Sequence, residues 1–165
     1  MQEHLIVDGN NAMHAIPEVS VELGRDRNLA RDSLLRMLEP VVGDGNRLTV
    51  VFDGRGGKGV LTRHNNLNEF DVYYSSSYEG ADGAIERMVM AAKNPEKICV
   101  ITNDGLIRNC AYEHGSSAMK VGEFLKRLDH SIDQISRRVR QNSPSKNTPN
   151  EPFNNGISFP EGFQL

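Results

Sequence analysis

Three short apolar runs in the sequence each lead into an aspartate that is followed by glycine. The runs cover residues 5–7, 48–52 and 98–101, and the acids that follow them are Asp8, Asp53 and Asp104. Short runs rich in valine, isoleucine and leucine are typical of strands buried on both faces of a sheet. Because polar residues with glycine favour turns, each strand is expected to end at or just before its acid.

Segments with helical periodicity separate these strands along the chain. Apolar residues recur three and four positions apart in residues 25–41, 81–92 and 105–113, which predicts amphipathic helices. Further strands are expected over residues 69–74 and 116–119, and a long last helix over residues 121–139. Strands that alternate with helices predict crossover connections. We therefore predict an α/β fold with a mainly parallel sheet and helices on both of its faces.

The composition is that of an ordinary globular protein. Of the 165 residues, 25% are charged and 38% are hydrophobic, and the net charge is −3. This charge lacks the basic excess of a dedicated nucleic-acid coat protein. No apolar run approaches the length of a membrane span, and the N-terminus lacks a secretory leader. The two cysteines, Cys99 and Cys110, suit a reducing compartment, so we expect a cytoplasmic protein without a membrane partner.

The C-terminal part of the chain differs in composition from the rest. We expect one folded domain over residues 1–140 and a tail over residues 141–165, in which proline and asparagine are frequent. Such a composition is typical of a flexible segment. The tail also contains apolar residues such as Phe153 and Phe159, so an arm that docks onto its own domain or onto a partner is the alternative.

Four acids are predicted to meet at one edge of the sheet. Parallel strands share a direction, so the carboxyl ends that precede Asp8, Asp53 and Asp104 lie along the same edge. Asp82 opens a helix that follows another strand, and the beginning of such a helix also faces this edge. Glu86 lies one helical turn after Asp82 and is a candidate fifth acid.

Carboxylates in such a group repel one another, which raises some of their pKa values. A hard divalent cation removes this repulsion, and Mg²⁺ is typically held by one or two carboxylates together with phosphate oxygens of a substrate. Such an ion can activate a water molecule for phosphodiester cleavage. Among the neighbouring amides, Asn11 is the preferred candidate for orienting a carboxylate or a metal-bound water. The simpler alternative is that each acid only forms a turn or caps a helix.

Four motifs in chain order carry a resemblance to a known family. They are residues 5–11 with His14, residues 50–53, residues 81–82 with 85–87, and residues 102–105. In this order the motifs resemble the YacP-like NYN domains, which belong to the PIN-like superfamily of metal-dependent ribonucleases. Two positions depart from the family pattern, because Asn10 stands where an aromatic residue is usual and Gly83 where a larger polar residue is usual.

The resemblance implies a three-layer α/β/α fold, a Mg²⁺ or Mn²⁺ site and endoribonuclease activity on single-stranded RNA. By motif match, the catalytic metal-site acids are Asp8, Asp82 and Asp104, with Asp53 beside them as a further ligand and Asn11 in support. Some family members act on messenger RNA on the ribosome, so such RNA is one candidate substrate. The oligomeric state stays open, with a homodimer as one alternative.

Basic residues near the acids are candidates for binding RNA. The loop after Asp53 is expected to carry Arg55, Lys58, Arg63 and His64 to the edge where the acids lie, and Arg108 adds charge there. Contacts from such side chains to phosphates position a nucleic acid without reading its sequence.

Three other functions are alternatives to this hypothesis. A phosphatase with an aspartyl nucleophile needs a second acid two residues after Asp8, where the chain has Asn10. A dinucleotide-binding domain needs a glycine-rich turn after the first strand, and residues 8–11 do not supply one. A non-catalytic module that binds RNA or the ribosome and keeps the fold is the remaining alternative. A metal-dependent endoribonuclease is the function that we predict.

Overall fold

The computed structural model of the protein, which describes residues 2–130, is built around one mainly parallel sheet. Its strands are β1 (His4–Asp8), β2 (Arg47–Phe52), β3 (Val60–Arg63), β4 (Phe70–Tyr74), β5 (Ile98–Ile101) and β6 (Ser117–Met119). They lie in the order β3-β4-β2-β1-β5-β6. All neighbouring strands are parallel except β3, which runs antiparallel to β4.

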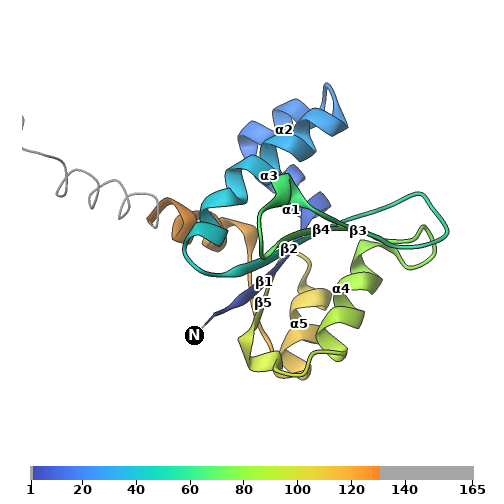
Figure 1. The fold of residues 1–165 in the computed structure, drawn as a ribbon, viewed down its shortest axis with the longest axis vertical. Coiled ribbons are helices and arrows are strands. Elements are labelled where there is room, and N and C mark those ends of the chain that lie inside the picture. Colours follow the sequence, from blue (N-terminus) through green and yellow to red (C-terminus); the bar gives the residue numbers. More distant parts are fainter. Residues whose placement is uncertain (1, 131–165) are drawn as a thin grey trace, which may run out of the picture. The chain divides into compact units, whose positions relative to one another are not determined.

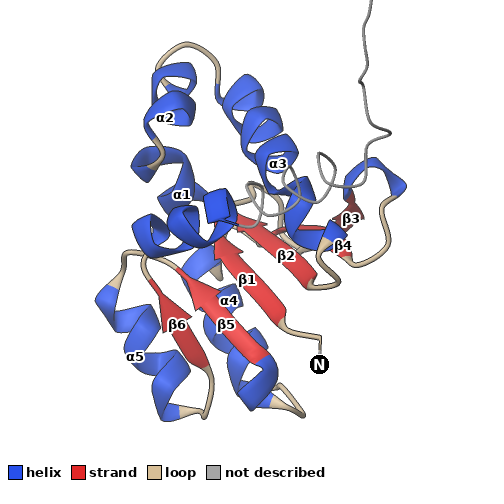
Figure 2. Ribbon diagram, turned by 90° about the vertical axis from the view of Figure 1, so that its left-hand side faces the viewer, coloured by secondary structure: helices blue, strands red, loops and turns tan. Residues whose placement is uncertain are grey.

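Helices cover both faces of this sheet. The α-helices are α1 (Gly9–Ala15), α2 (Pro17–Leu23), α3 (Arg27–Gly43), α4 (Gly80–Met90) and α5 (Gly105–Glu113), with short 3-10 turns at His64–Asn66 and Pro95–Lys97 and a further helical stretch over residues 121–130. Helices α1, α2 and α3 lie on one side of the sheet, and α4 and α5 lie on the other (Figures 1 and 2). The predicted three-layer α/β/α fold is confirmed. Within the described part of the chain, no helix combines the length and apolarity needed to cross a membrane.

Two hydrophobic cores follow from the alternation of side chains along the strands. In β1, Leu5 and Val7 pack into the core under α1, α2 and α3, whereas Ile6 packs into the core with α4 and α5. All three side chains are at most 1% exposed. Burial on both faces explains why the central strands appear in the sequence as continuous apolar runs and not as alternating ones.

The edge strand β3 differs from the expectation of a loop between Asp53 and His64. All of its residues are exposed, so the strand has no buried face and the sequence shows no apolar pattern over it. The strand carries the chain back along β4 and away from the edge where Asp53 lies, with Arg63 opposite Asp71. The second half of the helix expected over residues 121–139, and the tail expected over residues 141–165, fall outside the described residues.

The turn after β2 should tolerate no side chain at its glycine. A Cβ atom on Gly54 would lie 2.1 Å from the carbonyl oxygen of Ser75, which is backbone and cannot rotate away. We expect Gly54→Ala to lower the free energy of unfolding by about 1–3 kcal/mol, the usual range for overpacking. Urea denaturation followed by circular dichroism measures this change. Gly57→Ala is the matched control, since a Cβ there meets nothing within 4 Å, and equal losses in both variants would contradict the expectation.

Candidate active site

Asp8 is a buried carboxylate at the end of β1. Its side chain is 4% exposed, and its Oδ1 accepts a hydrogen bond of 3.3 Å from the backbone N–H of Asn11, which caps α1. The hydroxyl of Thr102 donates to Oδ2 over 3.0 Å. Burial raises the pKa of Asp8, these two hydrogen bonds oppose the shift, and the charges of Asp82 and Asp53 add to it. The two hydrogen bonds therefore hold the carboxylate in place, but neither partner carries a positive charge that would balance it.

Asp82 lies in the first turn of α4 and is exposed. Within the described part of the chain its carboxylate makes no hydrogen bond. Partial loss of surrounding water raises the pKa of Asp82, and the charges of Asp104, Asp53 and Glu86 raise it further. The interaction between two charges weakens with distance. Asp8 interacts with Asp53 and Asp82, and Asp82 interacts with Asp53 and Asp104, so the four acids form one electrostatic group. Strands β2 and β5 both pair with β1 in parallel, so Asp8, Asp53 and Asp104 lie along one edge of the sheet, while their role as metal ligands stays a prediction.

We call the group of Asp8, Asp53, Asp82 and Asp104 the acid edge. Within it, Asp53 connects the end of β2 to α4 and to α1. One carboxylate oxygen of Asp53 accepts a hydrogen bond of 2.8 Å from the backbone N–H of Ala81, and the other accepts one from the Asn10 side chain. Both oxygens are thus engaged. Asp53 fixes the beginning of α4, the helix that carries Asp82, to the end of β2.

Asp104 and Thr102 form the part of the acid edge that follows β5. Asp104 is half-buried and caps α5, since its Oδ1 accepts a hydrogen bond of 2.9 Å from the N–H of Leu106. The backbone N–H of Asp104 donates to the Thr102 hydroxyl over 3.1 Å, and that hydroxyl in turn donates to Asp8. Thr102 therefore links two of the acids. Thr102 is not among the site residues predicted from the sequence, and its place directly after the buried strand β5 is the signal that could have found it.

The two asparagines of the first turn and one after β5 hold the loops of the acid edge together. The side-chain oxygen of Asn11 accepts a hydrogen bond of 2.8 Å from the N–H of Asn103. The side-chain oxygen of Asn103 accepts one of 2.9 Å from the N–H of Val121. Asn11 thus ties α1 to the loop before α5, which is the contact of a positioning residue. Asn10 has a comparable place beside Asp53.

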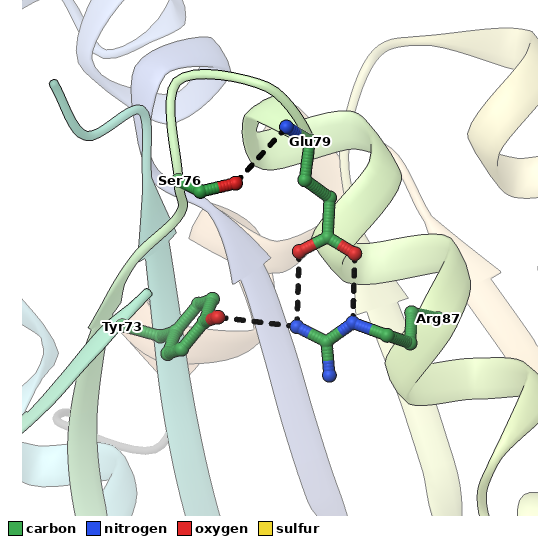
Figure 3. Close-up of polar contacts among 4 residues, drawn as sticks. All are labelled: Tyr73, Ser76, Glu79 and Arg87. Carbon is green, nitrogen blue, oxygen red and sulfur yellow. Dashed lines mark hydrogen bonds and ion pairs between the residues drawn. The ribbon is translucent and has the colours of Figure 1, made fainter. Parts of the chain in front are cut away.

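A network of polar contacts fixes the loop that leads into α4 (Figure 3). The Arg87 guanidinium donates two hydrogen bonds to Glu79, from Nε over 2.7 Å and from Nη2 over 3.0 Å. Arg87 also donates to the Tyr73 hydroxyl over 3.1 Å, and the N–H of Glu79 donates to Ser76 over 3.1 Å. This network joins β4, the loop and α4, and so restrains the helix that presents Asp82.

The predicted RNA-binding residues fall into two groups. Arg55 and Lys58 line a cleft of about 460 Å³ that Asp53 also lines. Arg108 donates from Nη1 to the carbonyl of Thr102 over 3.1 Å, which places its guanidinium beside the acid edge.

The expectation that Arg63 and His64 lie at the acid edge is wrong. Because β3 runs antiparallel to β4, both residues lie where β4 begins, which is the opposite end of that strand from Tyr74. His64 is paired with Glu39 at 2.7 Å and its ring packs against Phe70. Arg63 donates to the Asn68 side chain over 3.4 Å.

The acid edge offers oxygen ligands for a metal, although residues 2–130 contain no group of three or more His, Cys, Asp or Glu side chains placed to hold one directly. Mg²⁺ needs fewer, since one or two carboxylates, several waters and substrate phosphates usually complete its coordination. Among the described residues, nothing hydrogen-bonds to either carboxylate oxygen of Asp82 or to Oδ2 of Asp104. A group of repelling carboxylates with free oxygens fits a hydrated hard cation.

The pH dependence of stability should reveal the raised pKa of Asp8. A folded pKa above the unfolded one means that the native state binds the proton more tightly, so stability falls as pH rises through the interval between the two values. That interval begins near the unfolded Asp pKa of about 3.9. We expect the free energy of unfolding of Asp8→Asn to increase relative to wild type across it, in urea titrations from about pH 4 to about pH 7 without divalent cations. A difference that does not change with pH would contradict the raised pKa.

Comparisons with known proteins agree with this architecture. A family model described as the YacP-like NYN domain matches residues 5–158. A crystal structure of a mutant of Rae1 (YacP) from Bacillus subtilis is similar with a TM-score of 0.70 and 27% identity, covering 85% of this chain and 83% of that one. A second Rae1 (YacP) structure gives a TM-score of 0.64 at 27% identity, covering 86% and 81%. No curated protein sequence matches the chain significantly. The resemblance of the motifs is thus confirmed, and the chain belongs to the YacP-like NYN domain family.

Proposed function

We propose that this protein is a divalent-metal-dependent endoribonuclease that cleaves phosphodiester bonds of single-stranded RNA. Membership of the NYN domain family supports a ribonuclease-type function in general. The observation that supports the finer proposal is the group of acids from separate elements: burial raises the pKa values of both Asp8 and Asp82, and the charges of neighbouring acids raise them further, with no cationic side chain among the causes. A site with this excess of negative charge favours binding of a metal cation.

The residues that would hold Mg²⁺ or Mn²⁺ differ in how free their oxygens are. Asp82 and Asp104 have carboxylate oxygens that no residue in the range 2–130 hydrogen-bonds, and they are the preferred direct ligands. Asp8 adds a buried charge, whereas Asp53 has both oxygens engaged and contributes charge and the position of α4. When bound, such a cation lowers the pKa of a coordinated water and stabilises the leaving oxygen. Asn11 and Thr102 keep the carboxylates and loops in position.

The substrate in this proposal is RNA bound through its phosphates. Arg55, Lys58 and Arg108 lie next to the acid edge, where contacts to phosphates would position a strand without selecting its sequence. Messenger RNA on the ribosome is one candidate substrate, and a cytoplasmic location would give access to it. Arg63 and His64 are left out of the proposed RNA-binding set because they lie at the opposite end of β4.

A non-catalytic module that binds RNA or the ribosome is the second candidate function. One observation favours it: the side chains of residues 2–130 do not form a metal site of three or more direct ligands. The two candidates make different predictions for RNA that is incubated with the protein and a divalent cation.

An RNA cleavage assay separates these candidates. We expect wild type to cut unstructured RNA with Mg²⁺ or Mn²⁺ and to lose activity in EDTA. Asp8→Asn, Asp82→Asn and Asp104→Asn should each lower the rate by at least about 100-fold, since losing even a partner of a metal ligand costs 10–100-fold. Gel electrophoresis of a labelled RNA measures the rates.

The matched control for this assay is Asp32→Asn, which removes an exposed carboxylate from α3. We expect it to cleave as wild type does. Cleavage that survives all three substitutions at the acid edge would place the activity elsewhere. Absence of cleavage by wild type with either metal would favour the binding module.

Metal binding is also expected to be visible without RNA. An ion that binds only the native state raises the midpoint of thermal unfolding, so Mn²⁺ should stabilise wild type more than Asp82→Asn, and EDTA should reverse the effect. Differential scanning fluorimetry over a range of Mn²⁺ concentrations measures the shift. Equal shifts in wild type and Asp82→Asn would exclude Asp82 as a ligand.

A further inference from the structure

A cleft lies beside the acid edge, between the first turns of α3 and the loop that follows β2. Its volume is about 460 Å³. Arg27 and Arg31 line it from α3, one helical turn apart, and Arg55 and Lys58 line it from the loop. Two carboxylates also line the cleft and accept backbone hydrogen bonds, Asp26 as the N-cap of α3 and Asp53 from the N–H of Ala81 in the first turn of α4. We call this the basic cleft.

None of the four cationic side chains of the basic cleft forms an ion pair within residues 2–130. Long basic side chains that converge on a concave surface and lack acidic partners produce a positive local potential. The protein as a whole has a net charge of −3, so this positive potential is local. An anionic ligand is the partner that this arrangement fits.

Arg31 packs against two aromatic rings beside the cleft. Its guanidinium carbon lies 5.6 Å from the centroid of the Phe52 ring and 5.7 Å from that of Tyr74, at cation–π distance. Nη1 donates to the Asn28 side chain over 3.2 Å. Nε is buried and has no hydrogen-bond partner within the described part of the chain. An unpaired buried donor on a charged group is costly, so the chain itself does not satisfy all of the hydrogen-bonding capacity of this guanidinium.

A comparison with Arg87 shows what is missing at Arg31. Arg87 also lies over an aromatic ring, with its guanidinium carbon 5.8 Å from the centroid of Tyr73. In that case Glu79 accepts two parallel hydrogen bonds from the guanidinium (Figure 3). Arg31 is held by aromatic rings in the same way, but no ion pair to it is formed within residues 2–130. A phosphate has the geometry to take this place, because it accepts the paired donors of a guanidinium as a carboxylate does.

We propose that the basic cleft is the subsite for a backbone phosphate of single-stranded RNA on the Asp53 side of the cleavage site, with Arg31 as the main phosphate-binding residue. This proposal rests on the proposed function and adds Arg27 and Arg31 to its RNA-binding residues. Asp53 lines the cleft and belongs to the acid edge, so a strand held in the cleft reaches the acids by passing Asp53. Tyr74 and Phe52 form the floor beneath the guanidinium.

A binding measurement without divalent cations tests the subsite independently of cleavage. The probe is a fluorescent single-stranded RNA of about 12 nucleotides, within the range of site sizes for such proteins, and its anisotropy is followed at several salt concentrations. We expect Arg31→Met, which keeps an apolar stem over the rings, to weaken binding about tenfold through loss of a charge-assisted hydrogen bond. The slope of log K against log salt should fall by about 0.7, the value for one phosphate contact on a single strand.

Two further variants complete the design. Arg36→Gln removes an exposed arginine of the same helix that does not line the cleft, and it should bind RNA as wild type does. Lys58→Gln removes one exposed charge from the cleft without touching the core, so it should also reduce the slope by about 0.7 even if Arg31→Met folds poorly.

The outcomes distinguish this proposal from the proposed function. Weaker binding by Arg31→Met and Lys58→Gln together with absence of cleavage by wild type would keep the subsite and reject the nuclease. Metal-dependent cleavage by wild type together with unchanged affinity and salt slope in both variants would keep the nuclease and overturn the subsite. An equal loss in Arg36→Gln, or absence of RNA binding by wild type, would also overturn the subsite.

Discussion

Repulsion among four carboxylates at one edge of the sheet is the constraint on which the candidate site depends. Asp8, Asp53, Asp82 and Asp104 come from different elements of the chain. Burial raises the pKa values of Asp8 and Asp82, and the charges of neighbouring acids raise them further. A fold that needed only caps and turns would gain nothing from this coupling. A cation at the site would turn the repulsion into a favourable interaction.

The fold balances this repulsion with hydrogen bonds that do not neutralise the charges. The Thr102 hydroxyl joins Asp8 to the loop of Asp104, and the Asn11 side chain joins that loop to α1. Asp53 holds the beginning of α4. The acid edge is therefore arranged before any ligand binds, and its negative charge lies next to the positive potential of the basic cleft. A divalent cation would balance the negative charge of the acid edge, and an RNA strand would balance the positive potential of the basic cleft.

Burial explains which parts of the structure could be predicted from the sequence. Strands β1, β2 and β5 are buried on both faces and appear as apolar runs, so their ends located Asp8, Asp53 and Asp104 correctly at one edge. Strand β3 is exposed and left no such pattern, and missing it misplaced Arg63 and His64. Arg31 and Thr102 were not recognised because their roles arise from packing between distant elements. No periodicity in the sequence reports that an arginine on α3 lies over the rings of β2 and β4.

The location of a bound metal ion tests the central claim most directly. Crystals of the protein soaked in Mn²⁺ would reveal the ion by its anomalous scattering. The account predicts a peak at the acid edge, within coordination distance of carboxylate oxygens of Asp82 and Asp104. Crystals that contain Mn²⁺ at other positions and none at these carboxylates would contradict it.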